Sequence, residues 1–444
     1  MRHLPLLKPL NSLLIKPSGA DCNIDCTYCF YLDRAGIPRP GYNEETGSNR
    51  QQGRRMSDKV LDILIRQAMQ SGSPQISFGW QGGEPTLMGL PFFKKAVFLQ
   101  MKYGSPGQVV GNALQTNGLL INADWCQFLR ETNWLVGLSI DGPAHVHDRY
   151  RVTRNQRPTY DLVRAAAQQM NACNVEYNAL VVVNDYSVHH AREIYQHHKD
   201  LGIRFMQFIP CVERDPIHPD RAAPFSVTAE DYGNFLCEIF DCWKADFRGG
   251  KPAVSVRYFD SVFHTYVSVP PPECTLLPEC GSYVVVEYNG DVYSCDFFVE
   301  SEWKLGNVTE GSLLEMLNSR KQREFGALKA DLPTECLTCT WKRHCYGGCT
   351  KDRIRDPADH GSNHFCRSFI RFFEHADKEL RRLADDWIRK QRRYEQQEQF
   401  NRLIAARQAS SAEASRPSKP PARNSPCPCG SGKKFKSCCG HRNA

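Results

Sequence analysis

Short runs of β-branched and aromatic residues alternate with longer amphipathic segments in the first half of the chain. The runs predict strands at Leu13–Lys16, Gln75–Trp80, Val110–Gln115, Leu135–Ile140, Glu176–Val183 and Phe205–Ile209. The amphipathic segments predict helices at Asp58–Gln70, Pro91–Lys102, Ala123–Glu131, Tyr160–Asn171 and His189–Leu201. Such alternation is typical of an α/β fold in which helices cover a parallel sheet. Functional side chains are then expected in the loops that follow the strands.

The pattern changes after another predicted helix, Thr228–Phe247, and the pair Gly249-Gly250. Cysteines then become dense as far as Cys366, and apolar residues recur at helical spacing from Phe369 to Trp387. We expect an α/β domain at 10–250, a cysteine-rich domain at 251–380, a helix at 381–410, a linker at 411–424 and a small module at 425–444. The stretch Ala35–Arg55, rich in Gly, Asn, Gln and Arg, is predicted to be an insertion.

Composition indicates an ordinary globular protein, with 41% hydrophobic and 24% charged residues. No apolar run approaches the roughly 18 residues of a membrane span, and the first residues lack a secretion signal, so a cytoplasmic protein is expected. In a reducing compartment, 20 cysteines indicate metal binding rather than disulfides. The net charge of +7 has much of its excess beyond residue 381, and we expect neither a membrane nor a specific nucleic-acid partner.

Three closely spaced cysteines, Cys22, Cys26 and Cys29, follow the first predicted strand. A [4Fe–4S] cluster takes four thiolates, so three leave one iron open to a small molecule. A zinc loop with a distant fourth ligand is the structural alternative. The Cys-x3-Cys-x2-Cys spacing, followed by an aromatic residue, resembles the signature of radical S-adenosylmethionine (SAM) enzymes.

That resemblance implies a partial (β/α)6 barrel in which SAM completes the cluster and yields a 5′-deoxyadenosyl radical. Gly82-Gly83-Glu84-Pro85 resembles the motif that binds the SAM amino group, and the carboxylate beside the glycines can accept from an ammonium group. The other SAM contacts rest on the same similarity. They are Tyr28 and Gly83 at SAM, Ser139 at the ribose, Arg151 at the methionine carboxylate and Val212 along the adenine.

A second field of eight cysteines could close two further four-iron clusters. Its Cys-x2-Cys-x5-Cys-x3-Cys core resembles the SPASM extension of radical SAM enzymes that modify peptides. The resemblance implies one auxiliary cluster on Cys274, Cys280, Cys295 and Cys349, and another on Cys336, Cys339, Cys345 and Cys366. Two zinc sites are the alternative, because both metals use Cys-x2-Cys pairs.

Asp296 directly follows Cys295, where a carboxylate could take a proton from a substrate thiol or hydroxyl. By default it would be only a hydrogen-bonded turn residue. Its surroundings, 290–298, together with the cysteine trio, 81–86 and 139–143, resemble the anaerobic sulfatase-maturating enzymes over roughly residues 10 to 375.

This resemblance implies oxidation of a cysteine or serine in an unfolded or nascent sulfatase to Cα-formylglycine. Asp296 would act as the base, Tyr31 would place the substrate, and a low-potential donor would supply electrons. The second hypothesis is a maturase that forms thioether or carbon–carbon links in another ribosomal peptide. A non-enzymatic zinc-binding adaptor is the alternative of a different class.

The last module contains Cys427, Cys429, Cys438 and Cys439, which can supply four thiolates to one zinc ion. A segment this short would be ordered largely by its metal. It resembles the SEC-C motif, which implies docking to export or ribosomal machinery. A zinc knuckle with no consequence for catalysis is the alternative.

Overall fold

The computed structural model describes residues 7–31, 54–215, 218, 221–354, 361–414 and 421–441, with the backbone alone for 406–414. The chain divides into two compact units, Met1–Arg381 and Arg382–Ala444. Most of the insertion predicted at 35–55 and part of the linker predicted at 411–424 lie outside the described residues. None of the described helices combines the length and apolarity needed to cross a lipid bilayer.

The first unit is built on one sheet, whose described strands follow the order β10-β9-β8-β1-β2-β3-β4-β5-β6-β7. Its strands are β1 (Ser12–Lys16), β2 (Gln75–Trp80), β3 (Val109–Thr116), β4 (Leu135–Ser139), β5 (Tyr177–Val183), β6 (Phe205–Pro210), β7 (Ser255–Val256), β8 (Val284–Glu287), β9 (Asp291–Tyr293) and β10 (Lys304–Asn307). Pairing is parallel from β8 through β1 to β7 and antiparallel at β8–β9 and β9–β10. The six strands predicted from the sequence are confirmed as β1 to β6.

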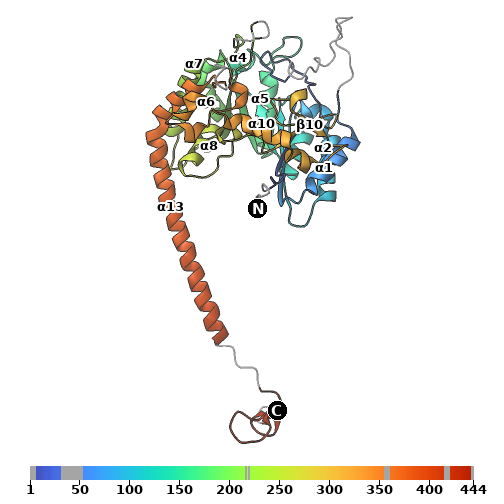
Figure 1. The fold of residues 1–444 in the computed structure, drawn as a ribbon, viewed down its shortest axis with the longest axis vertical. Coiled ribbons are helices and arrows are strands. Elements are labelled where there is room, and N and C mark those ends of the chain that lie inside the picture. Colours follow the sequence, from blue (N-terminus) through green and yellow to red (C-terminus); the bar gives the residue numbers. More distant parts are fainter. Residues whose placement is uncertain are drawn as a thin grey trace. The chain divides into compact units, whose positions relative to one another are not determined.

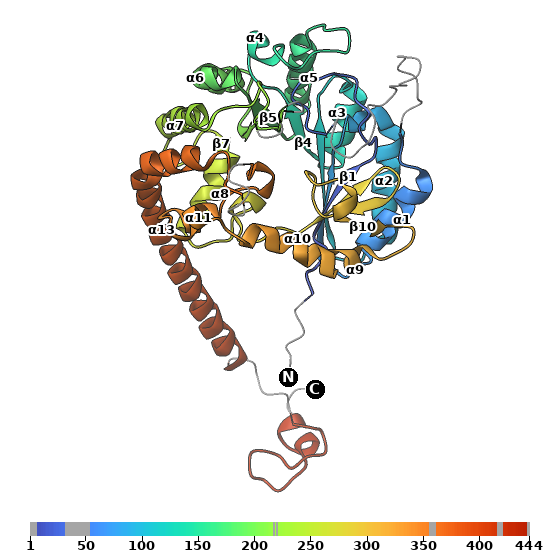
Figure 2. The same ribbon diagram turned by 45° about the horizontal axis from the view of Figure 1, so that its top comes forward.

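Helices cover the outside of this curved sheet (Figure 2). They are α1 (Asp58–Met69), α2 (Leu90–Tyr103), α3 (Ala123–Glu131), α4 (Ala144–His147), α5 (Tyr160–Ala172), α6 (Ala191–Asp200), α7 (Ala229–Ala245), α8 (Arg257–Tyr266), α9 (Leu313–Leu317), α10 (Arg320–Ala330), α11 (Thr334–Leu337), α12 (Lys342–Cys345) and α13 (Cys366–Ala414). Helix starts are fixed locally, because Ser57, Asn122 and Thr228 each accept a hydrogen bond from a backbone N–H in the first turn. The expected partial barrel with helices outside is therefore present.

The cysteine-rich stretch contributes strands to the same sheet. β8 lies beside β1, with Leu13 opposite Val284 and Lys16 opposite Glu287. All four β8 side chains are buried, so the strand is covered on both faces, as is usual for parallel strands. This pairing carries residues after 284 to the edge of the sheet where the β1 loop begins. The division at residue 250 stays a prediction.

The long helix α13 begins in the first unit and continues into the second (Figure 1). Its first turns bury Phe372, Phe373, Ala376 and Leu380. Phe372 stacks on Phe259 of α8, with ring centroids 5.3 Å apart. These contacts confirm the helical spacing read from Phe369 onward and identify that apolar face as core.

The side chain of Gln67 in α1 ties the barrel to the cysteine-rich stretch. Its Nε2 donates to the carbonyls of Val308 (2.8 Å) and Gly311 (3.0 Å), and its Oε1 accepts from the N–H of Leu313 (2.8 Å). Gln67→Ala should therefore cost about 2–3 kcal/mol of stability, since each partly buried hydrogen bond contributes about 1 kcal/mol. Anaerobic thermal and urea unfolding would measure the loss.

The matched control is Gln127→Ala, because Gln127 is exposed and makes one hydrogen bond, to Glu131. Its replacement should change stability by less than about 0.5 kcal/mol. If the two variants were equally stable, the hydrogen bonds of Gln67 would not stabilise the contact between the barrel and the cysteine-rich stretch.

Candidate active site

A cavity of about 680 Å³ opens at the carboxyl ends of the barrel strands. It is bordered by loops after β1, β2, β3, β4 and β6, and also by parts of the cysteine-rich stretch. Cys22, Cys274, Asp296 and Cys349 all line it. The cavity therefore lies at the strand ends, where functional side chains were expected, and both cysteine fields contribute to it.

Cys22, Cys26 and Cys29 lie in the loop after β1 and border the cavity. The neighbouring segment 152–154 holds this loop in place. The N–H of Asp25 donates to the Val152 carbonyl at 2.8 Å, and the Arg154 guanidinium donates to the Cys22 carbonyl at 2.8 Å.

Burial disfavours the negatively charged form of Cys22 and Cys26 in this loop. Burial raises the pKa of Cys22 to about 12, with a further contribution from the charge of Glu84. Burial also raises the pKa of Cys26, although the Arg151 guanidinium opposes this shift. Iron binds thiolates, so ionisation of Cys22 and Cys26 is coupled to binding of the metal.

Sulfur spacing distinguishes two kinds of cysteine group. Within the described ranges, metal-ligating atoms that all lie within 4.8 Å of one another occur in the four tail cysteines and in the exposed group His145, His190 and Glu193. The trio and the eight cysteines of the second field are not so tightly grouped. A single zinc ion holds thiolates about 3.8 Å apart, given Zn–S bonds of about 2.3 Å. The wider placement of the trio and the eight fits polynuclear clusters.

Gly83 brings the loop after β2 against the cluster loop. A Cβ at this position would lie 2.0 Å from the Asp21 carbonyl oxygen, so only glycine fits. The role expected for the adjacent Glu84, accepting from an ammonium group, stays a prediction. Its carboxylate is fully buried and accepts hydrogen bonds from Thr86, Thr116 and the Asn117 N–H. The carboxylate thus joins the loop after β2 to the end of β3.

The other residues predicted to contact SAM divide by position. Tyr28, Gly83, Ser139 and Arg151 border the cavity. Val212 is buried after β6, where its carbonyl accepts from Lys351 at 2.9 Å, and its neighbours Cys211 and Glu213 line the cavity instead. Contact of these residues with SAM stays a prediction.

Asp296 lies in the cavity with both carboxylate oxygens directed at fixed partners. Its Oδ1 is 2.5 Å from Lys16 Nζ, and its Oδ2 accepts from Gln81 Nε2 at 2.6 Å. Tyr31 lies next to this pair, because Lys16 Nζ is 3.5 Å from the centre of its ring. The Tyr31 hydroxyl donates to Glu287 Oε1 at 2.6 Å, and burial raises the pKa of Glu287.

The sequence analysis missed two residues that line this chamber, Lys16 and Gln81, and one that is buried beside it, Lys329. Lys16 had a weak signal, since it is a charged residue at the end of an otherwise apolar strand. Lys329 had none, because it lies in a polar helix. Its ammonium is nevertheless buried, and Nζ donates to the carbonyls of Thr275 and Gly348, each at 2.6 Å.

The second cysteine field falls into two neighbourhoods. Burial raises the pKa of Cys274, Cys295 and Cys349. The charge of Cys274 adds to the shift at Cys295 and Cys349, and the charge of Cys280 adds to the shift at Cys274. Burial, with smaller contributions from Cys336 and Cys339, raises the pKa of Cys345 to about 11. Cys366 begins α13, and its place with the second group stays a prediction.

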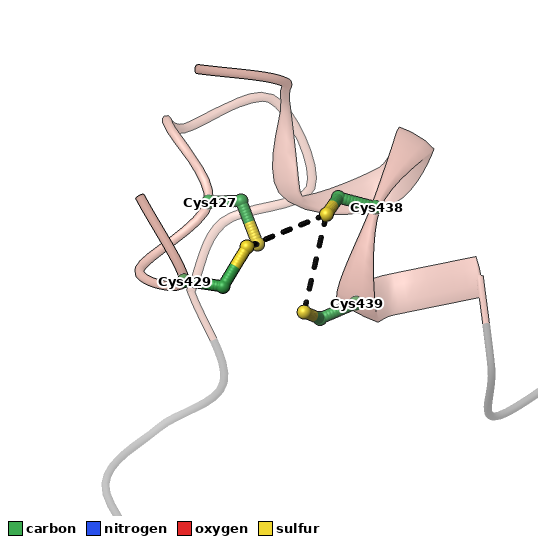
Figure 3. A group of neighbouring side chains, drawn as sticks. All are labelled: Cys427, Cys429, Cys438 and Cys439. Atoms are coloured by element: carbon green, nitrogen blue, oxygen red, sulfur yellow. Dashed lines mark hydrogen bonds between the residues drawn. The ribbon is translucent and has the colours of Figure 1, made fainter. Parts of the chain in front are cut away.

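The second unit ends in the four-cysteine group (Figure 3). The sulfur of Cys429 lies 3.3 Å from that of Cys427 and 3.4 Å from that of Cys438, which is 4.0 Å from Cys439. These separations are close to those around one tetrahedral zinc ion. Hydrogen bonds, chiefly with Ser431 and Cys427, lower the pKa of Cys429 to about 6, which favours the thiolate.

Profiles of three families match the chain. The radical SAM superfamily matches residues 17–197, the SPASM iron–sulfur cluster-binding domain matches 278–340, and the SEC-C motif matches 423–440. A serine-type anaerobic sulfatase-maturating enzyme from Bacteroides thetaiotaomicron is 39% identical over 390 residues, covering 84% of this chain and 91% of the relative. A cysteine-type enzyme of the same name from Clostridium perfringens is 36% identical and covers 85% of this chain and 99% of the relative.

A solved structure described as native anSMEcpe with bound AdoMet, which is SAM, and Cp18Cys peptide has a TM-score of 0.75 and 35% identity. It covers 85% of this chain and 99% of that chain. The expected radical SAM fold with a SPASM domain is confirmed, and the alternative of a non-enzymatic zinc adaptor is wrong. The chamber at the strand ends, the two cysteine fields and these relatives agree, and the chain belongs to the anaerobic sulfatase-maturating enzymes, radical SAM enzymes that use iron–sulfur clusters and SAM.

Proposed function

We propose that this enzyme oxidises a cysteine or serine of a sulfatase polypeptide to Cα-formylglycine. One observation carries the proposal: Asp296, held by Lys16 and Gln81, shares a single cavity with the cysteine trio. The relatives named above are serine-type and cysteine-type sulfatase-maturating enzymes. A chamber of about 680 Å³ has the size of a small-ligand site, so it admits SAM and a few peptide residues. The substrate is therefore an unfolded or nascent chain.

Three [4Fe–4S] clusters are proposed. The first is held by Cys22, Cys26 and Cys29 with SAM; the second by Cys274, Cys280, Cys295 and Cys349; the third by Cys336, Cys339, Cys345 and Cys366. Two observations support this assignment. Among the described residues, no three of these sulfurs all lie within 4.8 Å of one another, and the electrostatic effects among the auxiliary cysteines fall into two groups. With the first cluster reduced by a low-potential donor, SAM held there would supply the chemistry for hydrogen-atom abstraction from the target Cβ.

Asp296 is the proposed base. Its side chain is only 13% exposed, and its Oδ1 lies 2.5 Å from Lys16 Nζ, so a carboxylate that could act as a base is held at a fixed position. Gln81 fixes the second oxygen, so the carboxylate has a defined direction toward the cavity. Tyr31 is fixed by Glu287 and by the Lys16 cation, and it is proposed to place the substrate beside them.

The oxidation removes one hydrogen atom from Cβ, one proton from sulfur or oxygen, and one electron. Asp296 receives the proton. Cys295, its neighbour in sequence, belongs to the cysteine set that would hold the electron acceptor. A serine gives the aldehyde directly, whereas a cysteine gives a thioaldehyde that water converts to the aldehyde with release of hydrogen sulfide.

The tail is proposed to bind one zinc ion through Cys427, Cys429, Cys438 and Cys439 and to attach the enzyme to export or ribosomal machinery. The short sulfur separations support the metal. The match to the SEC-C motif over 423–440 supports a docking module. Such attachment would deliver the enzyme to sulfatases before they fold.

The reconstituted enzyme, given SAM, a strong reductant and a synthetic sulfatase peptide under anaerobic conditions, should convert the target residue to formylglycine. Mass spectrometry of cysteine and serine versions would show which side chain is used, with an alanine version as the control. Formation of 5′-deoxyadenosine with no change in either peptide would contradict the sulfatase substrate and favour another ribosomal peptide.

Asp296→Asn should lower formylglycine formation by about 100-fold, the usual scale for loss of a general base, while leaving SAM cleavage nearly intact. Asp291→Asn is the matched control, since Asp291 in β9 also pairs with a lysine, Lys304, at 2.8 Å. It should retain product formation within about two-fold. Full product formation by Asp296→Asn would remove Asp296 as the base.

Deletion of residues 411–444 should abolish the proposed zinc content but leave activity on a short peptide within about two-fold, because catalysis lies in the first unit. Metal analysis and peptide turnover would test both statements. A Cys427→Ser, Cys429→Ser variant of the full chain should lose the zinc in the same way. Loss of peptide activity in the deletion would contradict a purely docking role.

A further inference from the structure

We infer that Asp141 is the positioning residue of the SAM site, acting through Arg151 and Tyr28. The inference rests on the proposed function, because it takes Arg151 and Tyr28 as SAM contacts. Asp141 lies two residues after Ser139, at the carboxyl end of β4. No motif of the sequence analysis assigned it a role.

The Asp141 carboxylate is the centre of a buried hydrogen-bond network. Oδ2 accepts from the Tyr28 hydroxyl at 2.6 Å and from Arg151 Nε at 2.8 Å. Oδ1 accepts from Arg151 Nη2 at 3.1 Å and from the Val182 N–H at 2.9 Å. The pairing with Arg151 is therefore bidentate, which fixes the plane of the guanidinium as well as its position.

Burial makes this arrangement specific. The exposed fractions of the Asp141 and Arg151 side chains are 1% and 9%. A guanidinium so deeply buried needs a carboxylate partner, and Asp141 occupies only two of its five N–H donors. Arg151 also borders the cavity, and Asp141 leaves three of its guanidinium N–H donors unused. A ligand carboxylate would complete the pairing.

The same carboxylate reaches the cluster loop. Tyr28 immediately precedes Cys29, and the Arg151 guanidinium carbon lies 5.5 Å from the centre of the Tyr28 ring. Asp141 thus holds the proposed carboxylate-binding arginine and an aromatic residue of the cluster loop in one geometry. Its bond to Val182 anchors both to β5.

Asp141→Asn is the first test, because it keeps the shape but removes the charge and one acceptor facing Arg151. We expect the KM for SAM to rise about ten-fold or more, with the KM for peptide unchanged. The change in the electron paramagnetic resonance spectrum of the reduced cluster on adding SAM should require correspondingly more SAM. An unchanged KM for SAM would overturn the inference.

A double-mutant cycle separates positioning from a general effect on folding. If Asp141 acts through Arg151, Asp141→Asn should add little to the KM for SAM in an Arg151→Gln background. Fully additive effects would overturn the inference. The matched control is Asp246→Asn, because Asp246 also accepts from a tyrosine, Tyr195, and pairs with a cation, Lys199, away from the cavity. It should leave the KM for SAM unchanged.

Tyr28→Phe gives a second measurement should Asp141→Asn fail to load iron. It removes only the hydroxyl donor to Asp141, and we expect about a three-fold rise in the KM for SAM. No rise would overturn the inference. Wild-type enzyme that binds SAM but leaves sulfatase peptides unchanged would contradict the proposed substrate alone, while these SAM measurements would still decide the role of Asp141.

Discussion

A thiol that binds iron must lose its proton, and burial makes that loss unfavourable. Both requirements apply to the cluster cysteines of this protein. Burial raises the pKa of Cys295 to about 12, and it raises that of Cys349 well above its ordinary value. Metal binding and ionisation are therefore coupled, and the negative charge of the thiolates has to be balanced from the moment a cluster forms. The placement of the fixed cations follows from this requirement.

Three buried cations in or beside the chamber have defined partners. Lys329 donates to two backbone carbonyls beside the auxiliary cysteines, Lys16 pairs with Asp296, and Arg151 pairs with Asp141. A buried lysine or arginine without such partners would be as costly as an uncompensated thiolate. Paired, these side chains supply positive potential in fixed directions at little cost in reorganisation.

Part of this arrangement could be predicted from the sequence and part could not. Strands β1 to β6 were predictable because their apolar runs are local and are followed by turns or polar loops. The pairing of β1 with β8 was not, since it joins residues 13 and 284 and β8 is four residues long. That pairing places Glu287 opposite Lys16, and the chain after β8 then brings Asp296 into contact with Lys16. The proximity of the proposed base to the cluster loop is therefore a product of topology.

The motif residues show the same limit at the scale of side chains. The sequence located Gly83 and Glu84 at the site, but the direction of the Glu84 carboxylate depends on donors from Thr86, Thr116 and Asn117. Asp141 stands in the same Leu-Ser-Ile-Asp-Gly-Pro run as Ser139, yet its importance depends on Tyr28 and Val182, which lie far from it in sequence. Residue type identified the chemistry, whereas partners from other strands determine which groups face the cavity.

The two kinds of cysteine site show how one chain can keep two metals apart. The cluster thiols are mostly half-buried, and among the described residues no three of them have sulfurs all within 4.8 Å of one another, which does not suit a single small ion. In the tail, Cys429 and Cys439 are exposed and the four sulfurs are close together, which suits one tetrahedral ion and leaves no room for a four-iron core. Because first-row metals compete for thiolates by affinity, the spacing of the sulfurs is a property by which the protein itself can discriminate between them.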